Sequence, residues 1–241
     1  MARKGWSAGR NRRAARRTPS LVMMSRLSGE GAAMVASFYG DHHNTVITRP
    51  TDIQPAQSGM PRPSDAKSRF IATAADLFQR QGYNGVGLNE IIEASGAPKG
   101  SFYHHFPGGK EELGAEAVRL AGRRIGKLID QVFGDAQNFP AAALALADVI
   151  GGHFERSGWR EGCPVTAIVV DAVPQSERLS LAVAEVMGAW VDKATAHGER
   201  MGVPDARGRA ERFIIALEGA WLMSRVKRSR EPFRIAAEMA G

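Results

Sequence analysis

The side chains best suited to specific chemistry gather in one stretch, residues 99–106, with the sequence Lys-Gly-Ser-Phe-Tyr-His-His-Phe. If this stretch is helical, Phe102 and Phe106 lie four residues apart and turn inward on the same face. The outer face then presents ammonium, hydroxyl and imidazole groups in a short row. Such groups donate hydrogen bonds to base edges and to phosphate oxygens. The pattern therefore indicates a helix whose outer face contacts DNA.

Two preceding elements would hold this helix in place. Residues 65–78 are predicted to form an amphipathic helix with Ser64 as its N-cap. A second, short helix is predicted after Gly87, which would occupy its N-cap. Gly96 can take the left-handed conformation that ends this helix, and Pro98 suits the first turn of the next. The predicted inward stripe of the first helix is Ile71, Ala74, Ala75 and Phe78.

This order of elements is the layout of a helix-turn-helix, in which the second short helix enters the major groove. The motif covers about residues 87–106. A buried seam must fix the angle between the two short helices. We therefore predict a DNA-binding domain of three helices over residues 64–124. The seam candidates are Phe78, Leu88, Ile91, Ile92, Phe102 and Phe106.

Several residues of this domain are candidates for direct contact with DNA. Lys99 and Ser101 are placed for base edges or nearby phosphates, and Gly100 removes a side chain where the backbone must approach DNA. Tyr103 and His104 would position phosphates, and the alternative is that they are ordinary surface residues of a helical bundle. The motif favours contact with DNA for Tyr103 and leaves both alternatives open for His104. Lys110 is predicted to clamp a phosphate at the start of the following helix. The full set of candidates is Asn89, Lys99, Gly100, Ser101, Tyr103, His104 and Lys110.

The net charge of +7 is unevenly distributed along the 241 residues. Residues 1–63 carry ten Lys/Arg and three Asp/Glu, whereas residues 64–241 carry twenty-two of each. DNA binding is therefore predicted from the motif and not from bulk charge. The single cysteine excludes an internal disulfide and a cysteine-based zinc site, and it suits a reducing compartment. No apolar run is long enough for a membrane span, so we expect no membrane partner and a cytoplasmic location.

Residues 1–63 are predicted to be a disordered basic tail, Arg-rich at first and later broken by prolines. One interpretation is a basic arm that adds sequence-independent phosphate contacts. The other is a start codon assigned too far upstream, with Met60 as the true start. We favour an artefact or a passive tail, because no helical periodicity runs through these residues.

Residues 125–241 are predicted to form a helical domain for effector binding and dimerisation. Residues 165–173 are rich in β-branched side chains but have no partner strand, so a short buried helix is predicted there. The fold class is therefore all-α. Apolar periodicity predicts longer helices over residues 110–133, 141–155, 176–199 and 206–227. The inward stripe predicted for residues 141–155 is Leu144, Val149, Ile150 and Phe154. The stripe predicted for residues 176–199 is Leu179, Val183, Val186, Trp190 and Ala194.

Aromatic and sulfur-containing side chains in this second half are candidates for an apolar pocket, although they are also common in plain helical cores. Cys163 is interpreted as a buried structural thiol, a pocket residue, or a redox sensor that lacks a second cysteine. The helices 176–199 and 206–227 are the predicted dimer seam, a four-helix bundle, and Trp190 and Trp221 suit either the seam or the pocket. The pocket candidates are Phe154, Trp159, Cys163, Met187, Trp190 and Trp221, with Met223 as a further one.

Taken in order, the glycine turn, Lys-Gly-Ser-Phe-Tyr-His-His-Phe and Lys-Glu-Glu-Leu resemble the amino-terminal domain of the TetR family of bacterial transcriptional regulators. The turn at residues 106–110 is one residue longer than usual, and with Gly96-Ala97-Pro98-Lys99 it is similar to the LmrA/YxaF-like branch. Gly162-Cys163-Pro164 resembles that branch as well. The resemblance implies a homodimeric repressor that binds a palindromic operator in double-stranded DNA. It also implies release by a small effector, expected to be hydrophobic or aromatic, with no cofactor.

Other functional classes have less support. An activator or a protein-binding regulator of the same family stays open, because the sign of regulation depends on where the operator lies. A helical-bundle enzyme is the rival from another class. The sequence has no His-x-x-His or Glu-x-x-His pair, no Gly-rich phosphate loop and no serine elbow. We therefore expect no enzymatic activity and no metal site.

Overall fold

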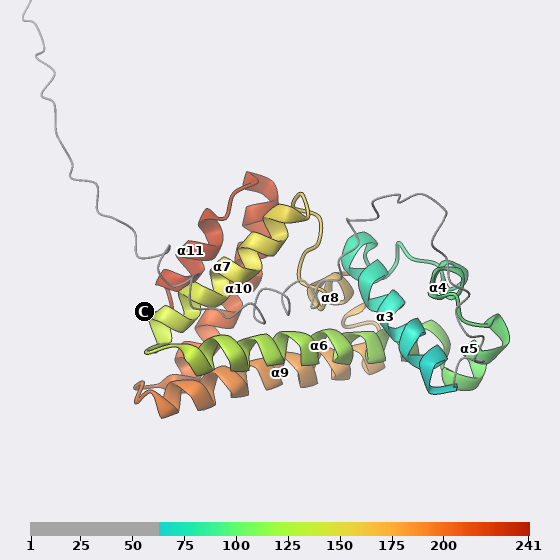
Figure 1. The fold of residues 1–241 in the computed structure, drawn as a ribbon, viewed down its shortest axis with the longest axis horizontal. Coiled ribbons are helices and arrows are strands. Elements are labelled where there is room, and N and C mark those ends of the chain that lie inside the picture. Colours follow the sequence, from blue (N-terminus) through green and yellow to red (C-terminus); the bar gives the residue numbers. More distant parts are fainter. Residues whose placement is uncertain (1–62) are drawn as a thin grey trace, which may run out of the picture. The chain divides into compact units, whose positions relative to one another are not determined.

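A computed structural model describes residues 63–241, and within this range the chain forms nine helices joined by loops (Figure 1). The predicted all-α fold is confirmed for these residues. The predicted tail and the alternative start at Met60 lie outside the described residues. No helix of the described part is both long enough and apolar enough to cross a membrane.

The first three helices correspond to the three predicted elements. They are α3 (Pro63–Gln81), α4 (Leu88–Ser95) and α5 (Lys99–His105). The prediction of Ser64 as the N-cap of the first helix was wrong, since α3 already includes Pro63. Proline favours the first helical turn because its fixed φ suits the helix, which places Ser64 inside that turn.

Six helices follow, among them the two short helices α8 and α11. The β-branched segment is the short helix α8, as predicted, but it is only partly buried, since Val170 is 74% exposed. Helix α11 was not predicted. The sequence signal for α11 is Pro232 in its first turn.

The predicted domain boundary after residue 124 falls inside the continuous helix α6 and stays a prediction. The bounds are α6 (Gly109–Asp135), α7 (Phe139–Arg156), α8 (Thr166–Ala172), α9 (Glu177–Arg200), α10 (Ala206–Lys227) and α11 (Glu231–Glu238).

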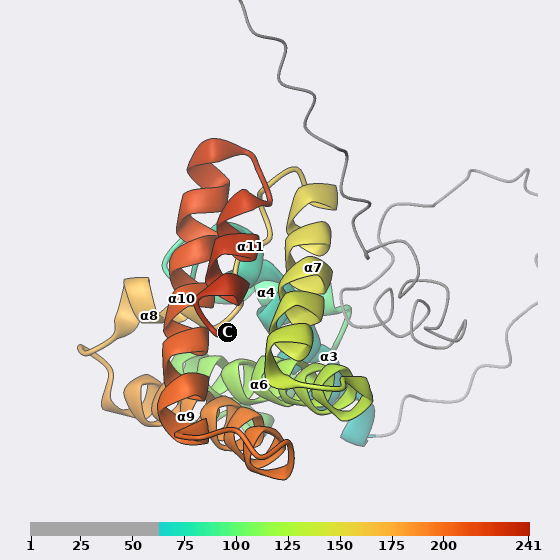
Figure 2. The same cartoon turned by 90° about the vertical axis from the view of Figure 1, so that its left-hand side faces the viewer.

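The two longest helices, α6 and α9, lie side by side and form the spine of the described part (Figure 1). Helices α7, α10 and α11 stand across this pair, with α11 against both α7 and α10 (Figure 2). The larger core lies where these helices meet. The predicted inward stripe of α9 is confirmed, because Leu179, Val183, Val186, Trp190 and Ala194 are all buried.

Two predicted stripes needed correction. On α3, Ala74, Ala75 and Phe78 are buried as predicted, whereas Ile71 is only half-buried and its neighbour Phe70 is completely buried in its place. On α7, Leu144 is 43% exposed. That helix is so rich in alanine that its apolar pattern fits more than one rotation, and packing against α11 and α6 selects the face. The buried residues of that face are Ala142, Ala143, Leu146, Ala147 and Ile150.

Close approach of α6 and α9 depends on Gly122. A Cβ at this position would lie 2.5 Å from both γ-methyl groups of Val186. The Gly122 carbonyl oxygen also accepts a hydrogen bond of 3.0 Å from Trp190 Nε1. Since valine is short and stiff, it has little room to move away.

We expect Gly122→Ala to lower the free energy of unfolding by about 1–3 kcal/mol, the usual cost of overpacking a core. Gly134→Ala, on the same helix, is the matched control, because a Cβ there would have no neighbour within 4 Å. It should stabilise by roughly 0.5 kcal/mol through helix propensity. Urea denaturation followed by circular dichroism measures both values, and equal effects of the two substitutions would contradict this account.

Candidate nucleic-acid interface and interior cavity

The turn between the two short helices has the predicted geometry. Gly87 is the N-cap of α4, and Gly96 ends that helix in the left-handed conformation with φ of 59°. The Gly96 N–H donates to the carbonyl oxygen of Glu93 at 3.1 Å. Pro98 immediately precedes α5 and occupies its N-cap. These local features fix the angle at which α5 leaves the turn.

The inner face of α5 is held by an aromatic cluster. Phe102 and Phe106 are completely buried, as predicted. Both meet the ring of Phe70 edge-on, with centroid distances of 5.3 and 6.2 Å. Edge-to-face contacts favour one relative orientation of the rings, so α5 has a fixed rotation about its own axis.

That rotation leaves the candidate DNA-binding residues on the outside. Lys99, Gly100 and His104 are exposed, and Tyr103 is 58% exposed. Asn89 is exposed on α4. The hydroxyl of Ser101 instead donates to the carbonyl oxygen of Pro98 at 2.7 Å, within the first turn of α5. Contact of any of these residues with DNA stays a prediction.

Lys110 has a second role besides the predicted phosphate contact. Its ammonium group donates to the carbonyl oxygen of Tyr83 at 2.7 Å and lies 4.3 Å from the centroid of the Tyr83 ring. Burial lowers the pKa of Lys110, and the carboxylate of Asp171 opposes this change. Lys110 therefore holds the loop between α3 and α4 against the start of α6.

The same loop is attached to α8. The backbone N–H of Asn84 donates to Asp171 Oδ2 at 2.8 Å, and the Asn84 side-chain amide donates to the Asp171 carbonyl oxygen at 3.1 Å. Gly82 allows this approach, since it has φ of 80° and a Cβ there would lie 2.8 Å from Asp171 Oδ2. The part of the chain predicted to bind DNA, α3 to α5, which we call the DNA-binding part, is thus bound to one end of α8.

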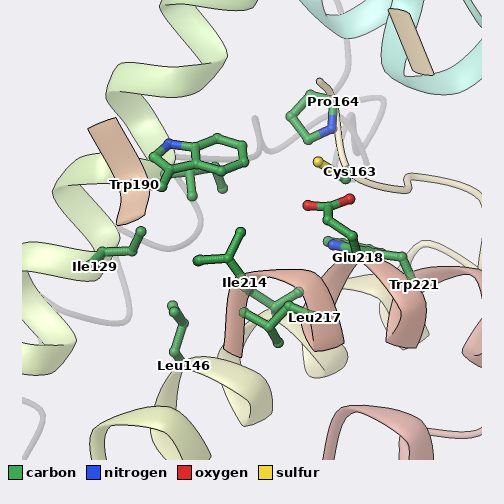
Figure 3. A pocket seen from close by; sticks show the side chains of 11 residues that line it. Ile129, Leu146, Cys163, Pro164, Trp190, Ile214, Leu217, Glu218 and Trp221 are labelled. Atoms are coloured by element: carbon green, nitrogen blue, oxygen red, sulfur yellow. The ribbon is translucent and has the colours of Figure 1, made fainter. Parts of the chain in front are cut away.

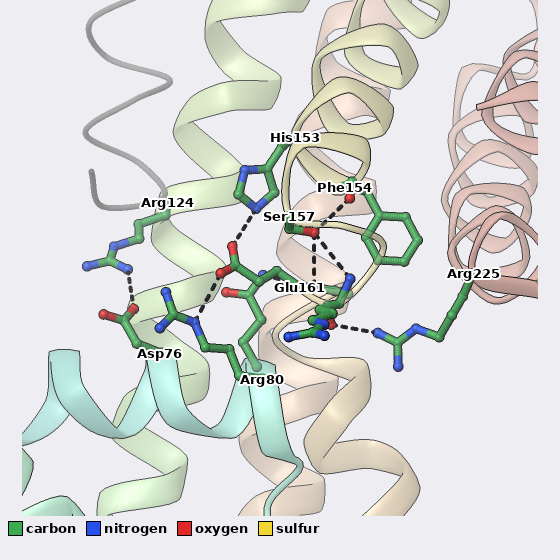
Figure 4. A network of polar contacts seen from close by, with 11 residues as sticks. Asp76, Arg80, Arg124, His153, Phe154, Ser157, Glu161 and Arg225 are labelled. Carbon is green, nitrogen blue, oxygen red and sulfur yellow. Dashed lines mark hydrogen bonds and ion pairs between the residues drawn. The ribbon is translucent and has the colours of Figure 1, made fainter. Parts of the chain in front are cut away.

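A second attachment precedes α8 (Figure 4). Gln79 Nε2 donates to the carbonyl oxygen of Gly162 at 2.8 Å, and Arg80 Nε donates to Glu161 Oε1 at 3.0 Å. The other carboxylate oxygen of Glu161 lies 3.1 Å from His153 Nε2 on α7. Two side chains of α3 therefore form hydrogen bonds with the loop that connects α7 and α8.

His153 gives this attachment a dependence on pH. Burial lowers the pKa of His153 to about 4, and the positive charge of Arg156 adds to this effect. The carboxylate of Glu161 acts in the opposite direction. The unfolded chain takes up the proton near the ordinary pKa of 6.5, before the folded chain does. The contribution of neutral His153 to the free energy of unfolding is therefore complete above pH 6.5 and is lost as the pH falls towards about 4.

Lowering the pH from 7 to 5 should reduce the free energy of unfolding of both the unaltered protein and His153→Gln. We expect this reduction to be about 1–2 kcal/mol smaller in His153→Gln, because that variant lacks the titrating imidazole. The measurement is urea denaturation at both pH values. His104→Gln, which alters an exposed histidine, is the control and should retain the full loss. The same loss in His153→Gln as in the control would contradict the assignment.

A small cavity of ≈ 20 Å³ lies in the larger core (Figure 3). This volume holds roughly one water molecule. Cys163, Trp190 and Trp221 were predicted as pocket residues, and all three line it. The remaining lining residues are Ile125, Ile129, Leu146, Ile150, Pro164, Ile214, Leu217 and Glu218.

The other predicted pocket residues lie elsewhere. Phe154 is buried in an aromatic cluster, 5.4 Å from the ring of Trp159 and 4.7 Å from that of Trp221. Met187 is half-buried on α9 and does not line this cavity, and Met223 is 49% exposed. Sequence periodicity placed Phe154, Met187 and Met223 on the correct helices but did not separate general core from cavity wall. Trp159 lies in the loop after α7.

Glu218 was missed, because a glutamate in an amphipathic helix usually faces solvent. The available signal was its position on the flank of the buried stripe formed by Leu217 and Trp221. Its carboxylate accepts hydrogen bonds from the hydroxyl of Thr166 and the thiol of Cys163. Burial raises the pKa of Glu218, and burial together with the nearby Glu218 raises that of Cys163 far above its usual value. A thiol with so little thiolate is unsuited to redox sensing.

Residues 160–171, which we call the connecting segment, join the features described above. Cys163 and Pro164 line the cavity, and Thr166 binds Glu218 on α10. On either side of these positions, Gly162 and Asp171 bind the DNA-binding part. One continuous stretch of chain therefore contacts both the cavity and the elements that precede the helix-turn-helix, namely α3 and the α3–α4 loop.

Comparison with known proteins identifies the family of this chain. Residues 70–117 match the family described as "Bacterial regulatory proteins, tetR family", and residues 140–239 match "Transcriptional regulator LmrA/YxaF-like, C-terminal domain". The regulator LmrA of Bacillus subtilis (strain 168) is 33% identical over 171 residues, which cover 70% of this chain and 90% of LmrA. The chain belongs to the TetR family.

Its second half is of the LmrA/YxaF-like type, which confirms the predicted branch. The regulator YxaF of the same organism is 31% identical over 176 residues, covering 72% of this chain and 92% of YxaF. A solved TetR regulatory protein from Rhodobacter sphaeroides aligns with a TM-score of 0.64 and 25% identity, covering 73% of this chain and 96% of that one.

TetR regulators bind double-stranded operator DNA, and this chain is a transcriptional regulator of that family and not an enzyme. Relatives with 25% identity include proteins named as transcriptional repressors, DhaR and NemR.

Proposed function

We propose that this TetR-family protein is a ligand-responsive repressor that acts as a homodimer on a palindromic operator in the cytoplasm. The observation that carries the proposal is the outer face of α5. Lys99, Tyr103 and His104 are exposed there, while two phenylalanines fix the rotation of the helix from behind. A positively charged and hydrogen-bonding face on a rigid helix is what major-groove binding requires.

Dimer formation is supported by a second apolar face on α10. Ile215, Leu222 and Val226 are 72%, 61% and 81% exposed, although the opposite face of the helix is buried in the core. With Gly219 they follow a four-three-four spacing and so share one side of the helix. Leu181, 63% exposed, adds to this on α9, which lies beside α10 (Figure 2).

We assign this apolar face to contact with a second copy of the chain. Pairing the same two helices from each subunit about a two-fold axis would form a four-helix bundle. It would also supply the two reading heads that a palindromic operator requires, about one helical turn apart.

The response to an effector follows from the connecting segment. The cavity holds about one water molecule, so a larger ligand enters only if the lining side chains move. Two of these lining residues, Cys163 and Pro164, belong to the segment that holds α3 and the α3–α4 loop. A ligand that prefers a displaced segment would lower operator affinity by its differential affinity for the two states.

The test is binding of the full chain to its own upstream DNA, measured by fluorescence anisotropy at roughly 50 and 200 mM salt. We expect nanomolar binding at the lower concentration that weakens by on the order of a thousandfold at the higher one, because phosphate contacts release counterions. An unrelated fragment of equal length is the control and should bind far more weakly. Absence of salt-dependent, sequence-selective binding would refute the proposal.

The sign of regulation needs a separate measurement. A reporter gene behind the upstream region should be more active when the regulator is absent. A fall in reporter activity in its absence would instead identify an activator, with the DNA-binding part of the proposal intact.

A further inference from the structure

The cavity combines an almost entirely apolar wall with a single acidic group. Glu218 is the only charged residue among those that line it. Trp190 and Trp221 contribute aromatic surfaces to the same wall. In Figure 3 the carboxylate of Glu218 points towards Cys163 and Pro164, with the ring of Trp190 on the other side of the space.

The carboxylate of Glu218 has neutral partners only. The donors to it are the hydroxyl of Thr166 and the thiol of Cys163, and among the described residues no cationic side chain forms an ion pair with it. Removal from water without a counter-charge disfavours the ionised form of a carboxyl group, and burial raises the pKa of Glu218 accordingly. A ligand that brings its own positive charge would supply the missing counterpart.

We propose that the effector of this regulator is a small arylalkylamine, with the amine on an aliphatic carbon next to the ring, whose ammonium group binds Glu218 and whose ring packs against Trp190 and Trp221. The proposal rests on the proposed function, since it takes the cavity as the effector site. Aromatic faces attract cations as well as apolar rings, so the two tryptophans suit both parts of such a molecule. Neutral and anionic aromatic compounds lack the group that pairs with the carboxylate.

Engagement of Glu218 has a consequence at the other end of α8. The ammonium group would compete with Thr166 for the carboxylate, and Thr166 is the first residue of α8. Asp171 lies in the last turn of this seven-residue helix and binds Asn84 of the DNA-binding part. Loss of the bond at one end therefore loosens the helix that holds the α3–α4 loop.

The test uses three probes with one aromatic body and different head groups: 2-naphthylmethylamine, 2-naphthylmethanol and 2-naphthoate. Binding to the full chain is measured by isothermal titration calorimetry near neutral pH. We expect the amine to bind at least about tenfold more tightly than the alcohol, since it adds a desolvated charge pair and a cation–π contact. The carboxylate probe should bind most weakly, because it places like charges together.

Three variants connect the preference to the proposed contact. Glu218→Gln keeps an acceptor for Thr166 but removes the charge, so the preference for amine over alcohol should vanish while alcohol binding stays within about twofold. Thr166→Val removes the competing donor, so amine binding should strengthen severalfold. Glu155→Gln removes an exposed carboxylate on α7 and should leave the preference unchanged.

Equal binding of amine and alcohol, an amine preference that survives in Glu218→Gln, or binding of none of the three probes overturns the proposal. Operator binding is measured on the same protein preparations. Intact operator binding without an amine preference would reject the ligand class and leave the regulator function standing. An amine preference without operator binding would reject the proposed function instead.

Discussion

A chain carrying Ile215→Asp and Leu222→Asp is expected to be monomeric and to lose operator affinity by on the order of a hundredfold or more. Both side chains lie on the exposed apolar stripe of α10, at 72% and 61% exposure. Two carboxylates on this stripe would have to be desolvated when the subunits meet, which is costly without a counter-charge. A monomer presents one reading head, so it forfeits the contacts of one half-site.

The mass is measured by light scattering after size-exclusion chromatography, and operator binding by anisotropy. Leu144→Asp is the control, since it places a carboxylate on an exposed leucine of α7, away from α10. It should leave both mass and affinity unchanged. Gly219→Arg is a second route to the same result, because its side chain starts in open space on the stripe. A dimeric mass for both seam variants would refute the assigned interface.

Tyr103→Ala and Gly100→Ala are each expected to lower operator affinity about 10- to 100-fold, while the free energy of unfolding changes by less than about 1 kcal/mol. Tyr103 is 58% exposed, so its truncation removes a DNA contact with little loss of packing. The substitution Gly100→Ala separates an effect on DNA binding from an effect on packing more clearly. A Cβ there meets no atom within 4 Å, so alanine fits the free protein and obstructs only a partner that approaches the backbone closely.

Operator affinity is measured by anisotropy with operator DNA, and the free energy of unfolding by urea denaturation. Leu144→Ala truncates another exposed side chain and should leave operator affinity unchanged. Unchanged affinity in Gly100→Ala would show that the backbone of α5 does not approach DNA closely. Unchanged affinity in both reading-helix variants would place the DNA contacts on another surface.

The helix-turn-helix could be predicted from the sequence because its determinants are local. Gly87, Gly96 and Pro98 set the ends of two short helices through backbone preferences of single residues. Phe102 and Phe106 lie four residues apart, which decides the inward face of α5 without knowledge of its neighbours. The same reasoning gave the all-α class and the buried stripe of α9.

Prediction was weaker where several faces of a helix were equally apolar. On α7 the alanine-rich sequence allowed more than one rotation, and Leu144 was placed inward although it is exposed. On α10 both opposite faces are apolar, so the pattern did not decide whether Trp221 faces the predicted dimer seam or the pocket. Contacts with neighbouring helices decide these rotations, and those contacts are not encoded within one helix.

By itself the sequence determined the family, the helical class and the residues on the outer face of the reading helix, because backbone preferences and periodicity act over a few residues. Only the tertiary structure decided the partners of polar groups that lie far apart in the sequence. Asn84 meets Asp171 and Gln79 meets Gly162 across separations of 87 and 83 residues, and Glu218 meets Thr166 across 52. A polar side chain has many available partners in an unfolded chain, and only the packed helices bring one of them within hydrogen-bonding distance.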